Sequence, residues 1–578
     1  MVQGQDQSGF ISIDCGLPEN SNYTEKNTGI NYISDANFID SGVTKTVSPQ
    51  DKATHQQQFS YVRSFPNGTR NCYRINVPRV TRYLIRASFL YGNYDGLNKL
   101  PQFDLYLGVN LWDTVKFTDS SVSINYEIIH TLSLDYIHIC MVNKGTGTPF
   151  ISVIEMRILD NVNYTTDPST SLARFRRLDF GSITNLTYRY GDDPYDRIWE
   201  PYWDEKWTQI SRRLSDDEYL ALNFFQTPDV VLETAATPIN ATASLDFYLE
   251  DDYDNNETQH QFYFYLHFTE LQKLPANQTR SFSVALNGVP WGNMELRYDF
   301  EDSKYTPTPY YGHKKYHISL SRTESSTLPP ILNALEIYVV KDFSKLQTQK
   351  DDDTHTPVDA VTNIKWAYRV DSRNWQGDPC APTAYKWQGV ECSPFDGSLR
   401  ITSLNLANNN LTGSVSNELL RKQSDGVLSL SVGQNPNLCA STSCNPQAND
   451  TRKKENNSAV IAVVASIAGI LLLLLIAAAI IIFCQRKKQH VAATYNILGK
   501  RRSSIKGTEL ESKQRQYSFN EVVKMTNSFD KILGRGGFGT VYHGFIEDIQ
   551  VAVKMLSLSS VQGYQQFVAE ASSQIKCA

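Results

Sequence analysis

The sequence predicts a mainly β protein of several parts: two β-sandwiches, a short repeat segment, one membrane helix and a small, incomplete α+β segment. Three observations support this prediction. Between residues 10 and 340, short runs such as 103–109 and 262–268 cluster aromatic and β-branched residues between turn residues. Residues 459–483 form a long apolar run without a charge. Residues 534–554 combine a glycine-rich loop with a β-type run.

The composition limits the classes of protein to which the chain can belong. Apolar residues make up 41% of the 578 residues and aromatic residues 11%, as in globular domains. The net charge is −6, and Lys and Arg do not gather in one long segment, so nucleic acid is not an expected partner. His and Cys do not occur at the spacing of a zinc site, and we expect no metal.

The β-type region carries signs of an internal duplication. No long amphipathic helix interrupts it, which favours antiparallel sandwiches. Three landmarks recur in the same order: FISIDCG at 10–16 with RLDFG at 177–181, the runs within 87–108 with those within 265–288, and 150–157 with 330–337. The alternative to a duplication is chance similarity between β-rich segments.

Four segments of this region resemble the tandem malectin-like ectodomain of plant receptor kinases: SIDCGLPEN, FLYGNYDG, VNKGTGTPFIS and GDDPYDRIW. The resemblance implies malectin-like subdomains at 10–165 and 175–343, and a carbohydrate or peptide ligand. Tyr91, Tyr94 and Asp95 are the candidate ligand residues, because aromatic rings stack on sugars and a carboxylate accepts hydrogen bonds from hydroxyls. The alternative is that the tyrosines pack the edge of the sandwich.

A polar linker at 344–365 separates this region from a second one. NWQGDPC at 374–380 and WQGVEC at 387–392 resemble the cap that precedes plant leucine-rich repeats, here 366–400. A degenerate repeat and closing cap follow at 401–445, with these residues on the repeat pattern: Ile401, Leu404, Leu406, Asn409, Leu411, Gly413 and Val415. A solenoid generally needs about three repeats, so we expect a short stalk rather than a ligand surface.

The cysteines indicate an oxidising compartment. Most of the nine precede residue 459, and two close pairs, Cys380/Cys392 and Cys439/Cys444, are disulfide candidates. Cys15, Cys72 and Cys140 form an odd set. One of these three is expected to stay free, and the sequence leaves their pairing open.

Residues 459–483 predict a membrane helix. At about 1.5 Å per residue the run spans about 37 Å, more than the roughly 30 Å hydrocarbon core, whereas a buried core helix is the alternative. Arg486, Lys487 and Lys488 follow directly, which places the C-terminal side in the cytoplasm. The basic linker at 485–515 is expected to touch anionic lipid. Ala465 and Gly469 would permit a helix dimer.

Glycosylation sequons support the same topology. All ten lie before the apolar run, at Asn22, Asn67, Asn163, Asn185, Asn240, Asn256, Asn277, Asn410, Asn449 and Asn456. We therefore expect a type I plasma-membrane protein whose N-terminal side is extracellular. The residues after Met1 show no apolar signal-peptide core.

The residues after the linker resemble the N-lobe of Ser/Thr receptor protein kinases, at 529–578. A glycine loop, a VAVK strand and a glutamate occur in kinase order, and the resemblance implies ATP and Mg as cofactors. The implied ATP-binding residues are Gly534, Gly536, Gly539, Val541, Ala552 and Lys554. Lys554 and Glu570 match the kinase ion pair.

No HRD, DFG or APE segment follows Glu570, so phosphotransfer by these residues is not expected. The leading interpretation is a single-pass cell-surface receptor-like protein that signals through partners such as co-receptor kinases. One alternative is an active receptor kinase whose sequence is truncated here. The other is a tether to cell-wall polysaccharide.

Overall fold

The protein is described as a computed structural model, which divides into two units, Met1–Ala448 and Asn449–Ala578. The described residues are 7–79, 81–159, 164, 167, 169–213, 223–251, 260–298, 300–348, 365, 375–395, 397–415, 417–439, 522, 524–527, 531–536, 539–546 and 549–556.

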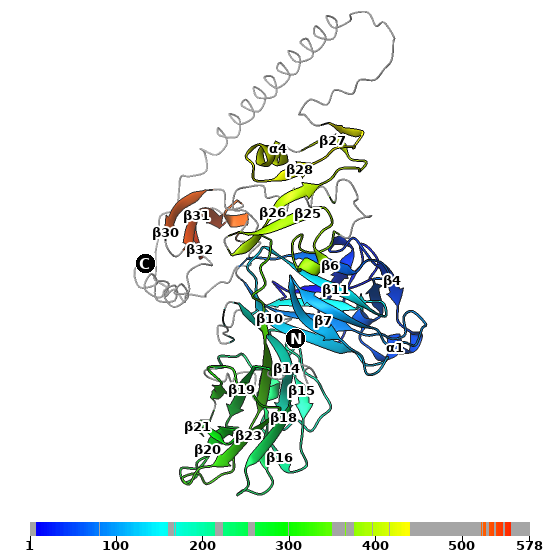
Figure 1. Cartoon of the computed structure of the whole chain (residues 1–578). Helices are drawn as coiled ribbons and strands as arrows, with labels where there is room; N and C mark the ends of the chain where they lie inside the picture. Colours follow the sequence, from blue (N-terminus) through cyan, green and yellow to red (C-terminus); the bar gives the residue numbers. More distant parts are fainter. Residues whose placement is uncertain are drawn as a thin grey trace, which may run out of the picture. The chain divides into compact units, whose positions relative to one another are not determined.

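One long sheet runs through the first unit (Figure 1). Its strands follow the order β2-β3-β1-β13-β7-β10-β14-β24-β19-β22, and β15 also pairs with β14. Their bounds are β1 Ile11–Asp14, β2 Asn22–Thr24, β3 Asn31–Ser34, β7 Arg82–Phe89, β10 Ile124–Thr131, β13 Val153–Ile158, β14 Thr170–Phe180, β15 Glu200–Tyr202, β19 Phe262–Thr269, β22 Glu301–Tyr305 and β24 Ala334–Asp342.

The sheet is continuous between the two sandwiches. β10 and β14 pair antiparallel, with Ile128 opposite Ala173 and Ile129 opposite Leu172. The first sandwich, before residue 160, and the second, after residue 168, thus share one hydrogen-bonded sheet. This pairing fixes the orientation of the two sandwiches more firmly than a flexible linker would.

Further sheets cover the long sheet in each sandwich. In the first they are β6 Arg70–Asn76, β11 Tyr136–Thr146, β8 Gln102–Leu107 and β9 Asn110–Val115, then β12 Phe150–Ile151, β5 Tyr61–Ser64 and β4 Val43–Thr46. In the second they are β18 Leu245–Glu250, β23 Lys315–Arg322, β20 Ser281–Leu286 and β21 Val289–Glu295, then β16 Trp207–Ser211 and β17 Thr234–Pro238. Aromatic and aliphatic side chains fill each core, such as Phe103 and Phe282.

The helices of this region are short. α1 spans Pro49–Thr54, where Ser48 accepts the first-turn N–H of Asp51 and Pro49 occupies the first position. α2 spans Asp229–Leu232, and 3-10 turns span Asp35–Asn37, called η1, and Gln57–Phe59, called η2.

The first landmark of the predicted duplication has the same local structure in both sandwiches. Asp14 and Asp179 are buried in β1 and β14, and Gly16 and Gly181 follow them with φ of 92° and 83°. A Cβ at either glycine would meet the backbone of a facing segment, at Val62 or Ala235. Only glycine satisfies both constraints, which explains its recurrence.

The cap and repeat segment form a small separate core. The 3-10 turn η3 spans Thr383–Tyr385, and a sheet combines β25 Val390–Phe395, β26 Ser398–Asn405 and β28 Ser429–Ser431, with β27 Thr412–Ser414, β29 Asn437–Cys439 and α4 Asn417–Ser424 beside it. The apolar positions of the repeat pattern are all buried. Asn409 donates from Nδ2 to the carbonyls of Leu406 and Ala407, at 2.7 and 3.0 Å.

The second unit contains one described sheet, of β30 Ile532–Gly536, β31 Gly539–Ile546 and β32 Ile549–Leu556. Within the described ranges, no helix is long and apolar enough to cross a membrane. The apolar run 459–483 lies outside those ranges, as do the linker 485–515 and Glu570.

Candidate functional site

A row of buried charges crosses the long sheet where the two sandwiches meet. We call it the charge ladder: Glu155, Arg86, Glu127, Arg177 and Glu336, on β13, β7, β10, β14 and β24. Arg86 lies opposite both Glu155 and Glu127, and Arg177 lies opposite Glu336. The signs alternate from strand to strand, so each charge has an opposite charge beside it.

The contacts within the charge ladder are short. Arg86 approaches Glu155 and Glu127 at 2.8 Å each, and Arg177 approaches Glu127 at 2.7 Å and Glu336 at 2.9 Å. Burial tends to raise the pKa of Glu127, but Arg177, Arg86 and Arg174 outweigh it and lower the pKa to about 2. The ladder therefore stays ionised near neutral pH. Removing one member would leave its neighbours buried with one opposite charge fewer.

The GDDPYDRIW segment at 191–199 packs against this ladder. Asp196 accepts hydrogen bonds from Arg86 at 3.2 Å, Arg157 at 2.9 Å and Arg189 at 2.7 Å. Asp193 accepts from Arg197 Nε at 2.8 Å and Trp199 Nε1 at 2.7 Å. Asp193 and Asp196 of this family-like segment thus neutralise the arginines that contact them.

A buried histidine extends the network into the second sandwich. His267 lies between Glu301, 3.1 Å from Nδ1, and Glu336, 3.2 Å from Nε2. Burial lowers the pKa of His267, but hydrogen bonds and charges of the two carboxylates outweigh burial and raise it above the ordinary value.

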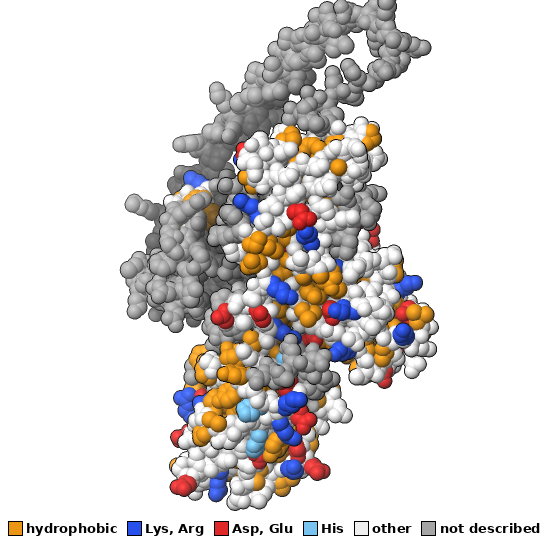
Figure 2. Space-filling view, viewed as in Figure 1, with side chains coloured by type: hydrophobic (Ala, Val, Ile, Leu, Met, Phe, Trp, Pro, Cys, Tyr) orange, Lys and Arg blue, Asp and Glu red, His pale blue; other side chains and the backbone are white. Residues whose placement is uncertain are grey.

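Two cavities border the charge ladder. One has a volume of about 320 Å³ and is lined in part by Ser88, Asn125, Glu155 and Arg189. The other has a volume of about 270 Å³ and is lined by residues that include Glu127, Arg174 and Glu200. On the face of this unit shown in Figure 2, Lys and Arg are interspersed with Asp and Glu rather than gathered in one basic patch.

The predicted ligand residues lie mostly inside the first sandwich. Tyr91 is fully buried and Tyr94 is 9% exposed, and both rings pack against Phe150. The Tyr91 hydroxyl donates to Asp95 at 2.6 Å, and the Tyr94 hydroxyl contacts Thr148 O at 3.4 Å. Burial raises the pKa of Tyr91 to about 12. This geometry favours the packing alternative over direct ligand contact.

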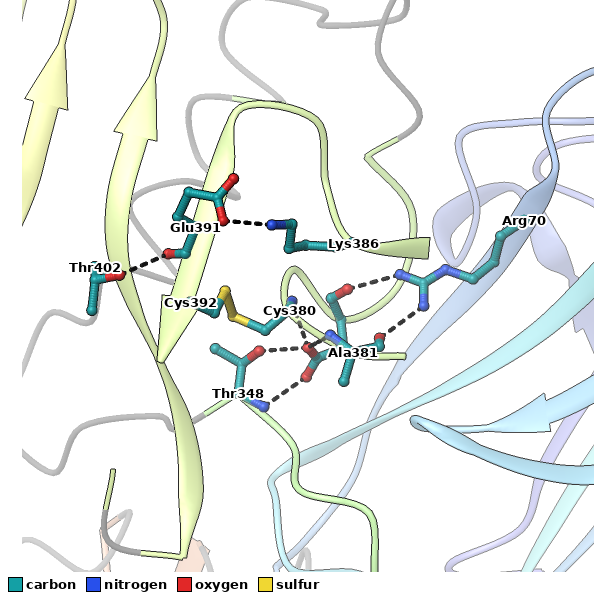
Figure 3. Close-up of a disulfide and its surroundings, with 9 residues drawn as sticks. Arg70, Thr348, Cys380, Ala381, Lys386, Glu391, Cys392 and Thr402 are labelled. Atoms are coloured by element: carbon teal, nitrogen blue, oxygen red, sulfur yellow. Dashed lines mark hydrogen bonds and ion pairs between the residues drawn. A yellow bond between two sulfur atoms is a disulfide. The ribbon is translucent and has the colours of Figure 1, made fainter. Parts of the chain in front are cut away.

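The cysteines form two disulfides among the described residues. Cys380 and Cys392 are joined at an S–S distance of 2.03 Å (Figure 3). Cys72 and Cys140, opposite each other on β6 and β11, are joined at 2.07 Å, and Cys15 is a buried free thiol. The side chain of Cys439 and all of Cys444 lie outside the described residues.

Sequence reasoning missed the contact that fixes the cap to the first sandwich. Arg70 of β6 is 1% exposed and donates to the carbonyl of Ala381 at 2.9 Å (Figure 3). It also donates to the carbonyls of Asp378, at 2.8 Å, and Gln376. Asp378 in turn accepts the N–H groups of Cys380 and Ala381, each at 2.9 Å. A lone arginine carries no sequence signal for such a role, because its partners are backbone atoms some 300 residues away.

In the second unit the predicted ATP-binding positions share one sheet. Gly536 and Gly539 face each other at the tip of the β30–β31 hairpin, and Lys554 on β32 lies opposite Val541 on β31. Ala552 lies opposite His543 in the same pair. Where the structure describes sequon asparagines, they are exposed: Asn22, Asn67, Asn185, Asn240, Asn277 and Asn410. The other four sequons, at Asn163, Asn256, Asn449 and Asn456, lie outside the described residues.

Comparison with known proteins gives the family. The model of the malectin-like domain matches residues 13–340. A putative leucine-rich repeat receptor-like serine/threonine-protein kinase of Arabidopsis thaliana is 40% identical over 625 residues, which cover 99% of this chain and 68% of the relative. A probable LRR receptor-like serine/threonine-protein kinase of the same species is 41% identical over 606 residues, which cover 98% of this chain and 68% of the relative.

Among solved structures, the ANX2 ectodomain from Arabidopsis thaliana is similar over 57% of this chain and 97% of its own, with 18% identity and a TM-score of 0.48. The malectin-like match covers more than half of the chain, and the kinase relatives align along nearly all of it. The chain therefore belongs to the plant family of malectin-like, leucine-rich-repeat receptor-like kinases.

Proposed function

We propose that the chain is a single-pass cell-surface receptor whose malectin-like region binds an extracellular carbohydrate or peptide. The observation that carries this proposal is the alignment with receptor-like kinases along 99% of the chain, which includes the apolar run and the basic residues after it. The one-sided sequons support the same topology, since N-glycans are added only in the secretory lumen. Membrane lipid contacts the basic linker 485–515 in this topology.

Inside the cell, the glycine hairpin and Lys554 support an origin from a kinase N-lobe. In such a lobe the hairpin covers the phosphates of ATP, while the lysine contacts them and pairs with a glutamate, here Glu570. The catalytic base and the metal-binding aspartate of kinases come from later segments. The intracellular part would act together with partner kinases, or through a helix dimer.

The topology is tested on intact cells that express the full chain with a C-terminal tag. External protease should shorten the tagged fragment to the part that follows the extracellular region, and an N-glycosidase should increase the mobility of the untreated chain. A tagged chain that is at the plasma membrane but keeps its full length under protease would contradict the proposal.

The kinase part is tested with purified full chain, ATP and Mg. The measurement is phosphate incorporation by wild type and by the Lys554→Ala variant, and equal incorporation by the two would favour signalling through partners. Incorporation that Lys554→Ala abolishes would favour the alternative, an active receptor kinase.

A further inference from the structure

The cavity of about 320 Å³ lies on the same face of the long sheet as the charge ladder, one step along the strands. Val153, Ser88 and Asn125 form a row across β13, β7 and β10, two residues along from the row of Glu155, Arg86 and Glu127. Because side chains two residues apart share a face, the cavity and the ladder are neighbours. Glu155 is the member of the charge ladder that lines the cavity, beside the row of Val153, Ser88 and Asn125.

Three other segments complete the walls. They are the turn at Asn27–Thr28, the 3-10 turn η2 with its preceding Gln56, and the loop from Thr187 to Ile198. The cavity is therefore built jointly by the first sandwich and by the loop that follows β14. Its volume lies at the lower end of the roughly 300–1,000 Å³ typical of ligand pockets, which suits one or two rings of a small ligand.

Neutral polar groups dominate the lining. They include the side-chain amides of Asn27, Gln56 and Asn125 and the hydroxyls of Ser123 and Thr187. Amides and hydroxyls both donate and accept hydrogen bonds, as the hydroxyls of a sugar do. An apolar peptide side chain would leave these groups unpaired, at a cost for each one.

Arg189 adds a fixed donor to this wall. Its Nε and Nη2 are held by Asp196 at 2.8 and 2.7 Å, and Nη2 also reaches Glu155 at 2.8 Å. Its Nη1 has no hydrogen-bond partner among the described residues. Glu155 already pairs with Arg86 and Arg157, so the charges next to Arg189 are balanced and favour a neutral acceptor over an anion.

A predicted glycosylation site lies at the rim. Asn185 is exposed, and Thr187, the third residue of its sequon, lines the cavity. Two residues span at most about 7 Å of chain, so a sugar attached to Asn185 starts within reach of the cavity.

We propose that this cavity binds a neutral pyranose sugar through its amides, hydroxyls and Arg189 Nη1. The sugar belongs either to the N-glycan on Asn185 or to a separate oligosaccharide, and the contacts are the same in both cases. Only the N-glycan alternative rests on the extracellular placement proposed above. Binding of a free sugar does not depend on that placement, because it can be measured on the purified chain.

The experiment uses the purified full chain in detergent and measures the unfolding midpoint and the binding of neutral di- to tetrasaccharides of glucose, mannose and N-acetylglucosamine. Asn27→Trp fills the exposed rim of the cavity and keeps the backbone N–H of residue 27 that donates to Glu25. Thr308→Trp places the same bulk at an exposed position of the second sandwich that does not line the cavity. Asn185→Gln removes the sequon at the rim, and Asn277→Gln removes an exposed sequon elsewhere.

If the sugar is external, wild type and Asn185→Gln bind a saccharide equally, Asn27→Trp weakens binding at least about tenfold, and Thr308→Trp does not. If the glycan on Asn185 fills the cavity, Asn185→Gln lowers the unfolding midpoint by at least about 2 °C relative to Asn277→Gln and gains saccharide binding that wild type lacks. The absence of saccharide binding in both wild type and Asn185→Gln, with equal midpoints for the two sequon variants, would overturn the proposal. If no sequon carries a glycan, the proposed extracellular topology is contradicted. The binding of free saccharides to wild type and Asn27→Trp then tests the cavity by itself.

Discussion

Asp179 provides a direct test of the energetics of the second sandwich. It lies on β14 and is 1% exposed, with Thr234 Oγ1 at 3.3 Å from Oδ1 and no hydrogen-bond partner for the buried Oδ2 among the described residues. Burial raises the pKa of its carboxyl to about 7. Asp179→Asn keeps the shape and polarity of the side chain but removes the ionisation.

The size of the effect follows from proton linkage. An unfolded aspartate has a pKa of about 3.9, so between that value and about 7 the folded protein binds more protons than the unfolded chain. Stability therefore falls as the pH rises through this window. The loss is about 1.5 kcal/mol at pH 5 and about 4 kcal/mol at pH 8, at roughly 1.36 kcal/mol for each tenfold change in proton affinity.

The measurement is the free energy of unfolding, or its midpoint, for the full chain at a series of pH values from 5 to 8. Wild type should lose about 2–3 kcal/mol relative to Asp179→Asn across that range. Glu205→Gln, which removes an exposed carboxylate of the same sandwich, should follow wild type. Parallel curves for wild type and Asp179→Asn would refute the assignment of a raised pKa to this residue.

Three further predictions test other parts of the structure. His267→Gln should lower the unfolding midpoint more at pH 5.5 than at pH 8.5. A histidine with a raised pKa stabilises the fold at low pH and loses this effect as the pH rises through its folded pKa. An equal loss at both pH values would contradict the pairing of His267 with its two carboxylates. Arg70→Ala should cost about 2–4 kcal/mol and raise hydrogen exchange at 376–381, whereas unchanged exchange would show that the cap is held without it. Gly181→Ala should lower the unfolding midpoint strongly, because its φ of 83° combines with a backbone contact at the Cβ position. Gly312→Ala, with a φ of 88° and open space around the Cβ position, should cost only about 1 kcal/mol of stability. Equal losses of stability in the two variants would exclude the steric cause.

Local patterns in the sequence predicted several features that the structure contains. The runs at 103–109 and 262–268 supply β8 and β19, because alternating or clustered aromatic and branched residues suit a half-buried strand. The leucine positions of the repeat segment are buried, and Asn409 bonds the backbone within its turn. The family resemblance also came from short segments, and the malectin-like match at 13–340 confirms it.

Long-range features could not be predicted in the same way. The Cys72–Cys140 disulfide depends on the register of β6 against β11, and the sequence left that pairing open. Tyr91 and Tyr94 have the composition of a sugar platform, yet the fold turns both rings toward Phe150. A tyrosine provides either an apolar ring or a hydroxyl, and only its neighbours decide which one matters.

The sequence by itself determined the order of the parts: β-rich region, cysteine-paired cap, apolar run and glycine loop, each encoded within a few dozen neighbouring residues. Only the tertiary structure decided that one sheet joins both sandwiches and that Arg86, Glu127 and Arg177 lie inside it. In a sequence such charges resemble solvated surface residues. Their burial is possible because strand pairing brings opposite charges within hydrogen-bond distance, and that pairing is set by strands far apart in the chain.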